Sequence, residues 1–337
     1  MLKINLYKFE RSKCKYTDDW YREIVNTEYF NIVGDFSSCE EKEVPFPTGP
    51  CVIISNCHTT YTPFLEKLKD KNINYGVIQQ SDETLADQFY FLEHKNCKFV
   101  ARGYIHPHTS YFTKLFHLGL GYGSGYTEIK NNQNYNEREL MWGFAGAVRG
   151  PAAGTTNFRT DRESAIEIFK YIEPNNVLSV GCGFTSSTRL LPTDYRSFMN
   201  NCKFALCPYG HTNNDTHRLY EALEAGCIPV VLKNSPHTAQ YAPSYWHAVF
   251  RLQQEDNVLP FCSPSDTVYN GVDVQGTIEE IPFIIGDTWE DCLSQVQNIL
   301  KNDKGEEVQL QCKNFWNKWK AYWSSLFVRN IKKLYEN

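Results

Sequence analysis

An arginine and a glutamate three residues apart, Arg218 and Glu221, stand near the start of an expected helix within KFALCPYGHTNNDTHRLYEALEAGCIPVVL, residues 203–232. At this spacing two side chains share one helix face, roughly 5–6 Å apart. The unpaired N–H groups of a helix N-terminus bind phosphate, and a guanidinium adds a fork of donors. Glu221, one turn deeper, can accept hydrogen bonds from two vicinal hydroxyls, such as those of a ribose. The competing interpretation is an ordinary exposed ion pair, worth ~0.3–0.5 kcal/mol.

The flanking residues predict the element order strand, polar loop, helix, strand. Lys203–Cys207 is a short apolar run, and residues 208–216 are rich in turn formers. Asp215 or Thr216 can cap the helix that follows, and Cys227–Leu232 is apolar and β-branched. This βαβ pattern places the polar loop at the carboxyl end of its first strand, where open parallel sheets bind ligands.

The block PYGHTNNDTHRLYEALEAGCIPVVL resembles the donor-binding signature of exostosin-like (GT47-type) glycosyltransferases. That signature runs Pro-x-Gly, a polar loop, then Arg-x-x-Glu-Ala-x-x-Ala-Gly-x-Ile-Pro-Val. The preceding YRSFMNNCKFALCP resembles the family's approach to the same loop. The resemblance covers about the C-terminal half of the chain and, more loosely, part of the N-terminal half. It implies a UDP-linked donor and inversion at the anomeric carbon.

Composition limits the classes of partner. A chain of 337 residues with 42% hydrophobic residues is long enough for two cores. Its net charge of −5 argues against nucleic acid and anionic membranes as partners. No apolar run is long enough for a membrane span or a signal peptide, so we expect a cytoplasmic protein. Twelve cysteines, mostly in apolar runs and without a Cys-x-x-Cys motif, indicate buried thiols rather than a zinc site.

Two successive α/β alternations predict two Rossmann-like domains that face each other, the GT-B architecture. Strands are expected at 2–6, 31–36, 51–55, 74–80, 97–102, 141–148, 177–180, 203–207, 227–232, 248–252 and 281–285. Helices are expected at 18–29, 62–70, 84–93, 161–171, 193–201, 216–226, 288–302 and 306–335. The Gly-rich stretch 119–126 is interpreted as a flexible turn.

The expected domains are an acceptor-side domain at 1–139, a nucleotide-sugar-binding domain at 140–305, and a helix at 306–337 that returns to the first domain. An aromatic stripe on that helix indicates core packing. Glycosyltransferases of another fold type use an Asp-x-Asp triplet to hold a metal ion that bridges the diphosphate. This chain has no such triplet. We therefore expect no cofactor and no metal requirement, with arginines and helix ends supplying the positive charge.

The resemblance implies a set of donor-binding residues. A basic residue after Phe-x-Gly and an arginine at the next helix start recur in the family, and FAGAVRG…TDRES supplies Arg149 and Arg162. They would neutralise the two phosphates as the glycosidic bond breaks. For Arg149 the alternatives are an ordinary surface role and replacement by Arg159. Tyr209 departs from the family's frequent arginine, and Tyr209 or His211 can stack on the nucleobase. The expected donor-binding residues are Arg149, Arg162, Pro208, Tyr209, Gly210, His211, Thr216, His217, Arg218 and Glu221.

An inverting transfer needs a carboxylate that takes the proton from the acceptor hydroxyl. Asp82 and Glu83 follow an expected strand at its carboxyl end, on the acceptor side. We expect Asp82 to be the base, with Glu83 and then His58 as substitutes. The competing interpretation is that Ser81 and Asp82 cap the next helix. The expected acceptor-side residues are His58, Arg102, Tyr104 and His106.

The resulting hypothesis is a metal-independent hexosyl- or pentosyltransferase that moves a sugar from a UDP-sugar to a glycan hydroxyl. UDP-xylose is the favoured donor, because shorter relatives in the family include xylosyltransferases; UDP-glucuronate and UDP-galactose stay open. Two other classes compete with this hypothesis. One is a catalytically silent nucleotide-sugar-binding protein, and the other is a glycan-binding module that uses aromatic platforms.

Overall fold

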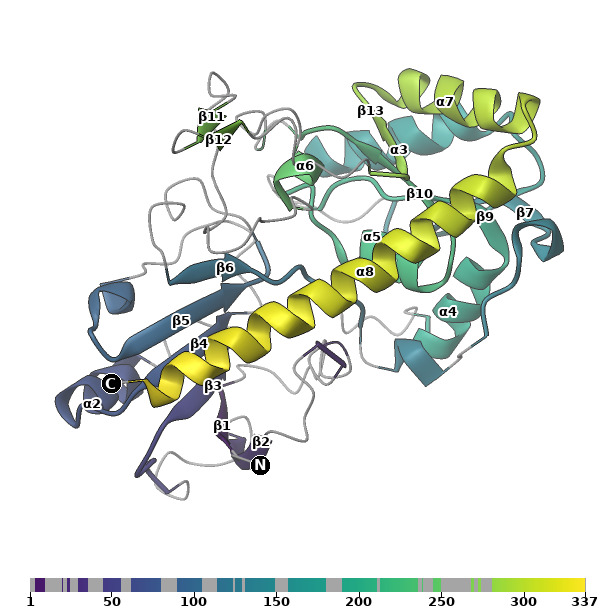
Figure 1. Ribbon diagram of the computed structural model, residues 1–337. Helices are drawn as coiled ribbons and strands as arrows, with labels where there is room; N and C mark the ends of the chain where they lie inside the picture. The colour runs from purple at the N-terminus through teal and green to yellow at the C-terminus, as the bar shows by residue number, and fades with distance from the viewer. Residues whose placement is uncertain are drawn as a thin grey trace.

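The computed structural model contains two parallel β-sheets flanked by helices, arranged as two lobes joined by a long C-terminal helix (Figure 1). The structure describes residues 4–9, 20, 23–24, 30–35, 45–55, 62–79, 90–104, 114–123, 125–128, 131–148, 157–179, 190–210, 213–235, 238, 245–249, 268–269, 272–273 and 281–336. The predicted fold class, an α/β GT-B architecture, is confirmed.

The first sheet has six parallel strands. In spatial order they are β2 (Phe30–Asp35), β1 (Ile4–Phe9), β3 (Cys51–Ser55), β4 (Tyr75–Gln79), β5 (Cys97–Arg102) and β6 (Leu115–His117). One face of this sheet packs on α2 (Thr62–Asp70) through Phe64 and Leu65. The other face belongs to the core that reaches the C-terminal helix, where the rings of Phe99 and Phe327 lie 5.7 Å apart.

The second sheet has five parallel strands. In spatial order they are β13 (Ile284–Gly286), β10 (Ile228–Leu232), β9 (Cys202–Leu206), β7 (Leu140–Gly146) and β8 (Asn175–Ser179). The helices around it are α3 (Asn157–Phe169), α4 (Pro192–Asn200), α5 (His217–Glu224), α6 (Tyr245–Val249) and α7 (Trp289–Lys301). A separate two-stranded antiparallel sheet pairs β11 (Val268–Tyr269) with β12 (Val272–Asp273).

Most expected elements lie within a few residues of the observed ones, and two differ. Three observed strands, β6, β11 and β12, were not predicted. The strand expected at 248–252 is wrong where the structure describes it, because Tyr245–Val249 forms α6. There the Tyr245 N–H donates to Asn234 Oδ1, and Trp246 Nε1 donates to the Leu232 carbonyl, so tertiary contacts override the local β propensity. The helix expected at 84–93 is a 3-10 turn at Tyr90–Glu93, and its earlier residues lie outside the described part.

The long helix α8 (Gly305–Lys332) runs from the second lobe to the first, as expected (Figure 1). Its first residue, Gly305, packs so closely on Tyr135 that a Cβ there would overlap the tyrosine ring. Just beyond its end, the Leu334 carbonyl accepts a hydrogen bond of 2.9 Å from Asn74 Nδ2, beside the first sheet. The expected domain boundaries stay a prediction.

Aromatic side chains fill the junction that α8 crosses. Trp316 of α8 stacks on Trp20 with ring centroids 5.4 Å apart and planes 9° from parallel. Tyr220 of α5 lies 5.9 Å from Trp316, and Trp323 lies 5.7 Å from Trp20 at a steep angle. All four side chains are buried. The expected aromatic stripe of α8 is therefore core packing between the lobes.

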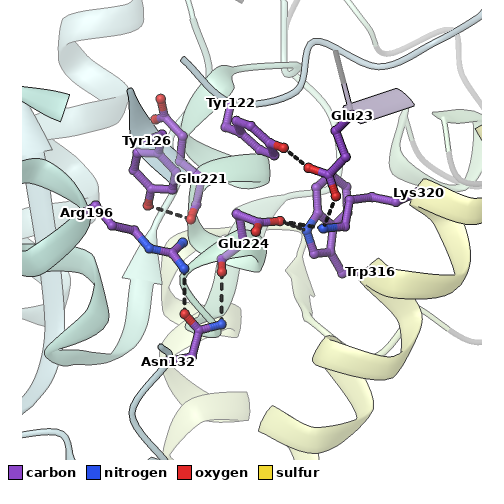
Figure 2. Close-up of polar contacts among 9 residues, drawn as sticks. All are labelled: Glu23, Tyr122, Tyr126, Asn132, Arg196, Glu221, Glu224, Trp316 and Lys320. Carbon is purple, nitrogen blue, oxygen red and sulfur yellow. Dashed lines mark hydrogen bonds and ion pairs between the residues drawn. The ribbon is translucent and has the colours of Figure 1, made fainter. Parts of the chain in front are cut away.

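A charged group lies at the edge of this aromatic cluster (Figure 2). Lys320 Nζ lies 2.7 Å from Glu23 Oε1 and 2.9 Å from Glu224 Oε2. Trp316 Nε1 also donates to Glu224, and the Tyr122 hydroxyl donates to Glu23. Burial lowers the pKa of Lys320, but the two carboxylates outweigh burial and hold that pKa above its ordinary value. The group ties α5, α8 and Glu23 together.

Candidate functional site

Residues 213–215, which precede the N-cap of α5, make side-chain hydrogen bonds to other segments. Asn214 Nδ2 donates to the Leu232 carbonyl at 3.0 Å, and the Thr238 hydroxyl donates to Asn214 Oδ1 at 2.7 Å. Asn213, Asn214 and Asp215 are all buried, whereas Thr216 at the N-cap is partly exposed. The helix corner is thus covered by protein up to Asp215. Backbone amides that can contact a ligand therefore begin at Thr216.

Arg218 lies in the first turn of α5 and crosses the carboxyl ends of two strands. Its guanidinium carbon lies 4.9 Å from the centroid of the Phe144 ring in β7, and its Nη1 donates to the Pro208 carbonyl after β9 at 3.3 Å. A Cβ at Gly146 would lie 2.9 Å from Arg218 Nη2, so a glycine is needed to leave space for the guanidinium. Its Nε is buried and has no hydrogen-bond partner among the described residues.

Arg162 brings a second guanidinium to the same strand ends. It lies on α3, and its Nη1 donates to the Ala147 carbonyl just after β7 at 2.8 Å. Burial raises the pKa of the neighbouring Asp161 to about 6, and the positive charges of Arg162 and Arg218 both oppose that rise. The two arginines, expected from sequence as diphosphate ligands, therefore lie near one carboxylate. Two cations and a helix N-terminus at one sheet edge can bind a diphosphate.

Glu221 faces the Gly-rich segment rather than bulk solvent. Its Oε1 accepts a hydrogen bond of 3.3 Å from the Gly123 N–H. Burial raises its pKa, and the charges of His217 and Arg218 act in the opposite direction. Since Glu221 and Arg218 are both partly covered and have separate partners, an exposed ion pair does not describe them. Ribose binding by Glu221 stays a prediction.

The Gly-rich segment after β6 lies against α5 and is buried, so it is not the flexible turn expected from its composition. The Gly121 carbonyl lies 2.9 Å from His217 Nδ1. Gly119 and Gly121 have φ values of +69° and +67°, which side chains with a Cβ rarely adopt. The Tyr126 hydroxyl donates to the Glu221 carbonyl at 2.6 Å (Figure 2). These contacts fix the position of α5 relative to the first sheet.

A buried histidine of the first sheet contacts the residue that precedes the α5 N-cap. His117, at the end of β6, has its Nε2 3.5 Å from Asp215 Oδ2 and 2.7 Å from the Gly103 carbonyl. Tyr245 of α6 lies 3.4 Å from the same carboxylate oxygen. Burial raises the pKa of Asp215, and His117 opposes that rise. Asp215 therefore joins the lobes and does not cap the helix.

The first sheet ends in a row of polar residues, one from each of four neighbouring strands. The strand registers pair Ser55 with Gln79, Gln79 with Arg102, and Arg102 with His117. All four are buried at the carboxyl edge of the sheet. Arg102 thus lies beside His117, and Tyr104 is also buried. The acceptor-side role of both residues stays a prediction.

The remaining expected site residues divide into two groups. Tyr209 is only 7% exposed, so its ring offers little surface for stacking, and the Gly210 N–H donates to the Asn213 carbonyl at 2.8 Å, which closes the turn. The expected residues that lie outside the described part of the chain are His58, Asp82, Glu83, His106, Arg149 and His211.

Sequence reasoning missed three residues that shape this site, namely His117, Tyr126 and Asp161. Each acts through a partner distant in the chain: His117 contacts Asp215, Tyr126 contacts Glu221, and Asp161 contacts Tyr209. The Gly-x-Gly spacing was the one local signal, because it marks a backbone that must approach another element closely.

A known protein family matches part of the chain. The exostosin GT47 domain matches residues 104–262, which are 159 of the 337 residues. The resemblance to exostosin-like glycosyltransferases is therefore confirmed, and the matched region contains both Arg162 and Arg218. No curated protein sequence matches the chain.

One solved structure, HepE, shares the overall fold across nearly the whole chain. Alr3699/HepE from Anabaena, crystallised with UDP and glucose, has a TM-score of 0.50 at 7% identity, covering 98% of this chain and 99% of that one. A glycosyltransferase from Rickettsia africae ESF-5 has a TM-score of 0.48 at 8% identity, covering 99% of both chains. At such identities the HepE likeness concerns the fold. The chain thus resembles exostosin GT47 domains over residues 104–262 and shares the fold of HepE.

Neither a membrane-spanning helix nor a metal site is present among the residues that the structure describes. None of the helices in that part of the chain has the length and apolarity needed to cross a bilayer. In the same residues, no cluster of three or more His, Cys, Asp or Glu side chains is arranged to hold a metal ion.

Proposed function

We propose that this protein transfers a sugar from a UDP-sugar to a glycan hydroxyl, with inversion at the anomeric carbon. The observation that carries the proposal is the placement of Arg162 and Arg218 at the carboxyl ends of β7 and β9, beside the N-terminus of α5. Parallel sheets bind ligands at this edge, and the diphosphate of a UDP-sugar needs such donors. The structure of HepE with UDP, on a similar fold, supports the nucleotide assignment.

The two arginines and the helix end would stabilise the leaving group. As the glycosidic bond breaks, negative charge grows on UDP, and fixed donors stabilise that charge more than they stabilise the intact donor. Arg218 is well suited because its ring contact with Phe144 and its bond to the Pro208 carbonyl fix the guanidinium before the ligand arrives. No metal ion is needed in this scheme.

The acceptor would approach from the first lobe. Asp82 is the proposed base, with Glu83 and then His58 as substitutes, and Arg102 is a proposed acceptor-side residue. The proposed donor is UDP-xylose, with UDP-glucuronate and UDP-galactose as alternatives. The acceptor-side role of Tyr104 and His106, the nucleobase contacts of Tyr209 and His211, and the cytoplasmic location stay predictions.

Calorimetric titration with UDP, with and without Mg²⁺, tests the donor site directly. We expect binding that does not depend on Mg²⁺ and that Arg218→Ala weakens strongly. A protein that gives no heat at millimolar UDP, yet binds glycans, would be a glycan-binding module instead.

Catalysis is tested separately from binding. Screening nucleotide sugars by thermal shift identifies the donor, and hydrolysis of that donor is then compared between the parent protein and Asp82→Asn. We expect the variant to bind the donor and to lose hydrolysis. If the parent protein binds the donor but Asp82→Asn, Glu83→Gln and His58→Ala all match its hydrolysis rate, the assigned base is wrong.

A further inference from the structure

The peptide group between Pro208 and Tyr209 is held from both sides by charged side chains. Its N–H donates to Asp161 Oδ2 at 3.1 Å, and its carbonyl accepts from Arg218 Nη1 at 3.3 Å. Among the described residues the only cis peptide is Glu173–Pro174, so this peptide is trans. In a trans peptide the N–H and C=O groups point in opposite directions. The carboxylate and the guanidinium therefore form hydrogen bonds at opposite edges of one peptide plane.

Asp161 is itself fixed on its other oxygen. Its Oδ1 accepts a hydrogen bond of 2.7 Å from Trp289 Nε1, at the start of α7, and the residue is 7% exposed. The carboxylate thus joins α3, the turn after β9 and α7. The Oδ2 bond holds the Tyr209 N–H, and the separate Oδ1 bond ties the carboxylate to α7.

Burial of the Asp161 carboxylate disfavours its charged form. Burial raises its pKa to about 6, so it is ionised at neutral pH, with Arg162 and Arg218 as the neighbouring cations. The other titratable groups that face it are Tyr209 and Cys292, and the Asp161 charge contributes to their raised pKa values. A negative charge at this place would by itself repel a diphosphate. Its presence in the site therefore needs another explanation.

We propose that Asp161 is a positioning residue for the donor site, which fixes the Pro208–Tyr209 peptide and thereby the place of the Arg218 guanidinium. This inference rests on the proposed function, because it assumes that Arg218 binds the diphosphate. Without the Asp161 acceptor, the peptide is free to rotate, the Pro208 carbonyl turns away, and Arg218 loses the bond that aims it. The carboxylate acts through the peptide and does not contact the donor.

Titration with UDP at pH 7.5 distinguishes positioning from simple charge. Asp161→Asn removes the negative charge. If Asp161 affects UDP only through that charge, the variant should bind UDP more tightly. Positioning predicts weaker binding, by about tenfold, which corresponds to loss of one hydrogen bond to a charged group. Asp161→Glu keeps the charge but displaces the carboxylate by one methylene, and we also expect it to weaken binding. This second variant carries the test if Asp161→Asn does not fold.

The matched control is Trp289→Phe, which removes the other partner of the same carboxylate. It leaves the bond to Tyr209 in place, so UDP affinity should stay within about twofold while the thermal midpoint falls. If Trp289→Phe weakens UDP binding as much as Asp161→Asn does, the role of Asp161 is general packing and the inference is wrong.

A double-mutant cycle adds a readout that a purely structural role does not change. Arg218→Lys cannot keep the guanidinium bond to the Pro208 carbonyl. Adding Asp161→Asn to Arg218→Lys should therefore weaken UDP binding little further. Arg162→Lys changes the bond to the Ala147 carbonyl and not the bond to Pro208. In the Arg162→Lys protein, Asp161→Asn should therefore weaken UDP binding as much as it does in the parent protein. If Asp161→Asn weakens UDP binding equally in the Arg218→Lys and Arg162→Lys proteins, the inference is wrong.

The outcomes separate this inference from the proposed function. A parent protein that does not bind UDP at all refutes the UDP-sugar proposal. A parent protein that binds UDP, with an Asp161→Asn variant that folds and binds it equally or more tightly, leaves that proposal in place and refutes the positioning role of Asp161.

Discussion

At the scale of single residues, the site depends on a few side chains that are held by backbone groups. Arg218 and Arg162 are each anchored to a carbonyl at the end of a strand, and these anchors set where positive charge lies. The sequence pattern predicted that Arg162 and Arg218 are donor-binding residues. It did not predict Asp161, because its partners Tyr209 and Trp289 are 48 and 128 residues away in the chain. Contacts of that kind leave no local spacing signal.

Replacement of Arg218 by lysine should weaken UDP binding by roughly tenfold or more, even though the charge is kept. A lysine ammonium cannot lie flat on the Phe144 ring and bond to the Pro208 carbonyl while it contacts a phosphate. Calorimetry at constant ionic strength measures the change. Lys203→Arg is the control, since Lys203 lies over the Tyr135 ring near the amino end of β9, whereas Arg218 lies at the carboxyl end. UDP affinities that are equal in the parent protein and Arg218→Lys would contradict a direct role for the guanidinium.

Asp161 also predicts a pH dependence of stability. Its folded pKa of about 6 lies above the ordinary value of 3.8, so the folded state holds this proton more tightly than the unfolded state. Its stabilising effect is complete below about pH 4 and is lost as the pH rises to about 6, a difference of about 3 kcal/mol. Urea denaturation of the parent and Asp161→Asn from pH 4 to pH 7 measures this. We expect the variant to gain stability relative to the parent across that range, and parallel curves would contradict the pKa.

At the scale of elements, the Gly-rich segment explains why α5 has a fixed place relative to the first sheet. The sequence predicted β3, α2 and β5 with their observed bounds, because each is a compact apolar or amphipathic run. It missed β6, which has only three residues and pairs only with β5. The left-handed glycines and their contacts with α5 are tertiary features that composition alone does not reveal.

Gly121→Ala should destabilise the protein by about 2 kcal/mol or more, because φ is +67° and the added methyl group would overlap the Trp20 ring. The matched control is Gly49→Ala, where a Cβ meets nothing within 4 Å. Urea denaturation of both variants is the measurement. Equal stabilities would show that the segment can move away from Trp20 without loss.

At the scale of the whole molecule, the two sheets are joined by α8 and by the side chains that it carries. Trp316 and Lys320 contact Trp20, Glu23 and Glu224, so one helix holds residues of both lobes. The sequence predicted this return because of the aromatic stripe at helical spacing. The ion pairs at its edge were beyond sequence reasoning, since they join residues that are 297 and 96 positions apart.

Lys320→Met should lower the free energy of unfolding by about 2 kcal/mol, because it leaves the mostly covered Glu224 carboxylate without its cation. Lys170→Met is the control: its pair with Glu167 is exposed, so the free energy of unfolding should change little. Tryptophan fluorescence and far-UV circular dichroism should follow one urea transition in the parent protein. If the two signals separate in the parent, the lobes unfold independently and the junction contributes little.

The place of α8 in the chain also has a consequence for biosynthesis. The helix follows both sheets in the sequence, so a ribosome completes the strands of each lobe before it makes the segment that fastens them. Until Trp316 and Trp323 emerge, the indole of Trp20 and the ring of Tyr220 lack the partners that cover them in the finished protein. A nascent chain halted before residue 305 would present this apolar surface to chaperones, and translation of one further helix would remove it.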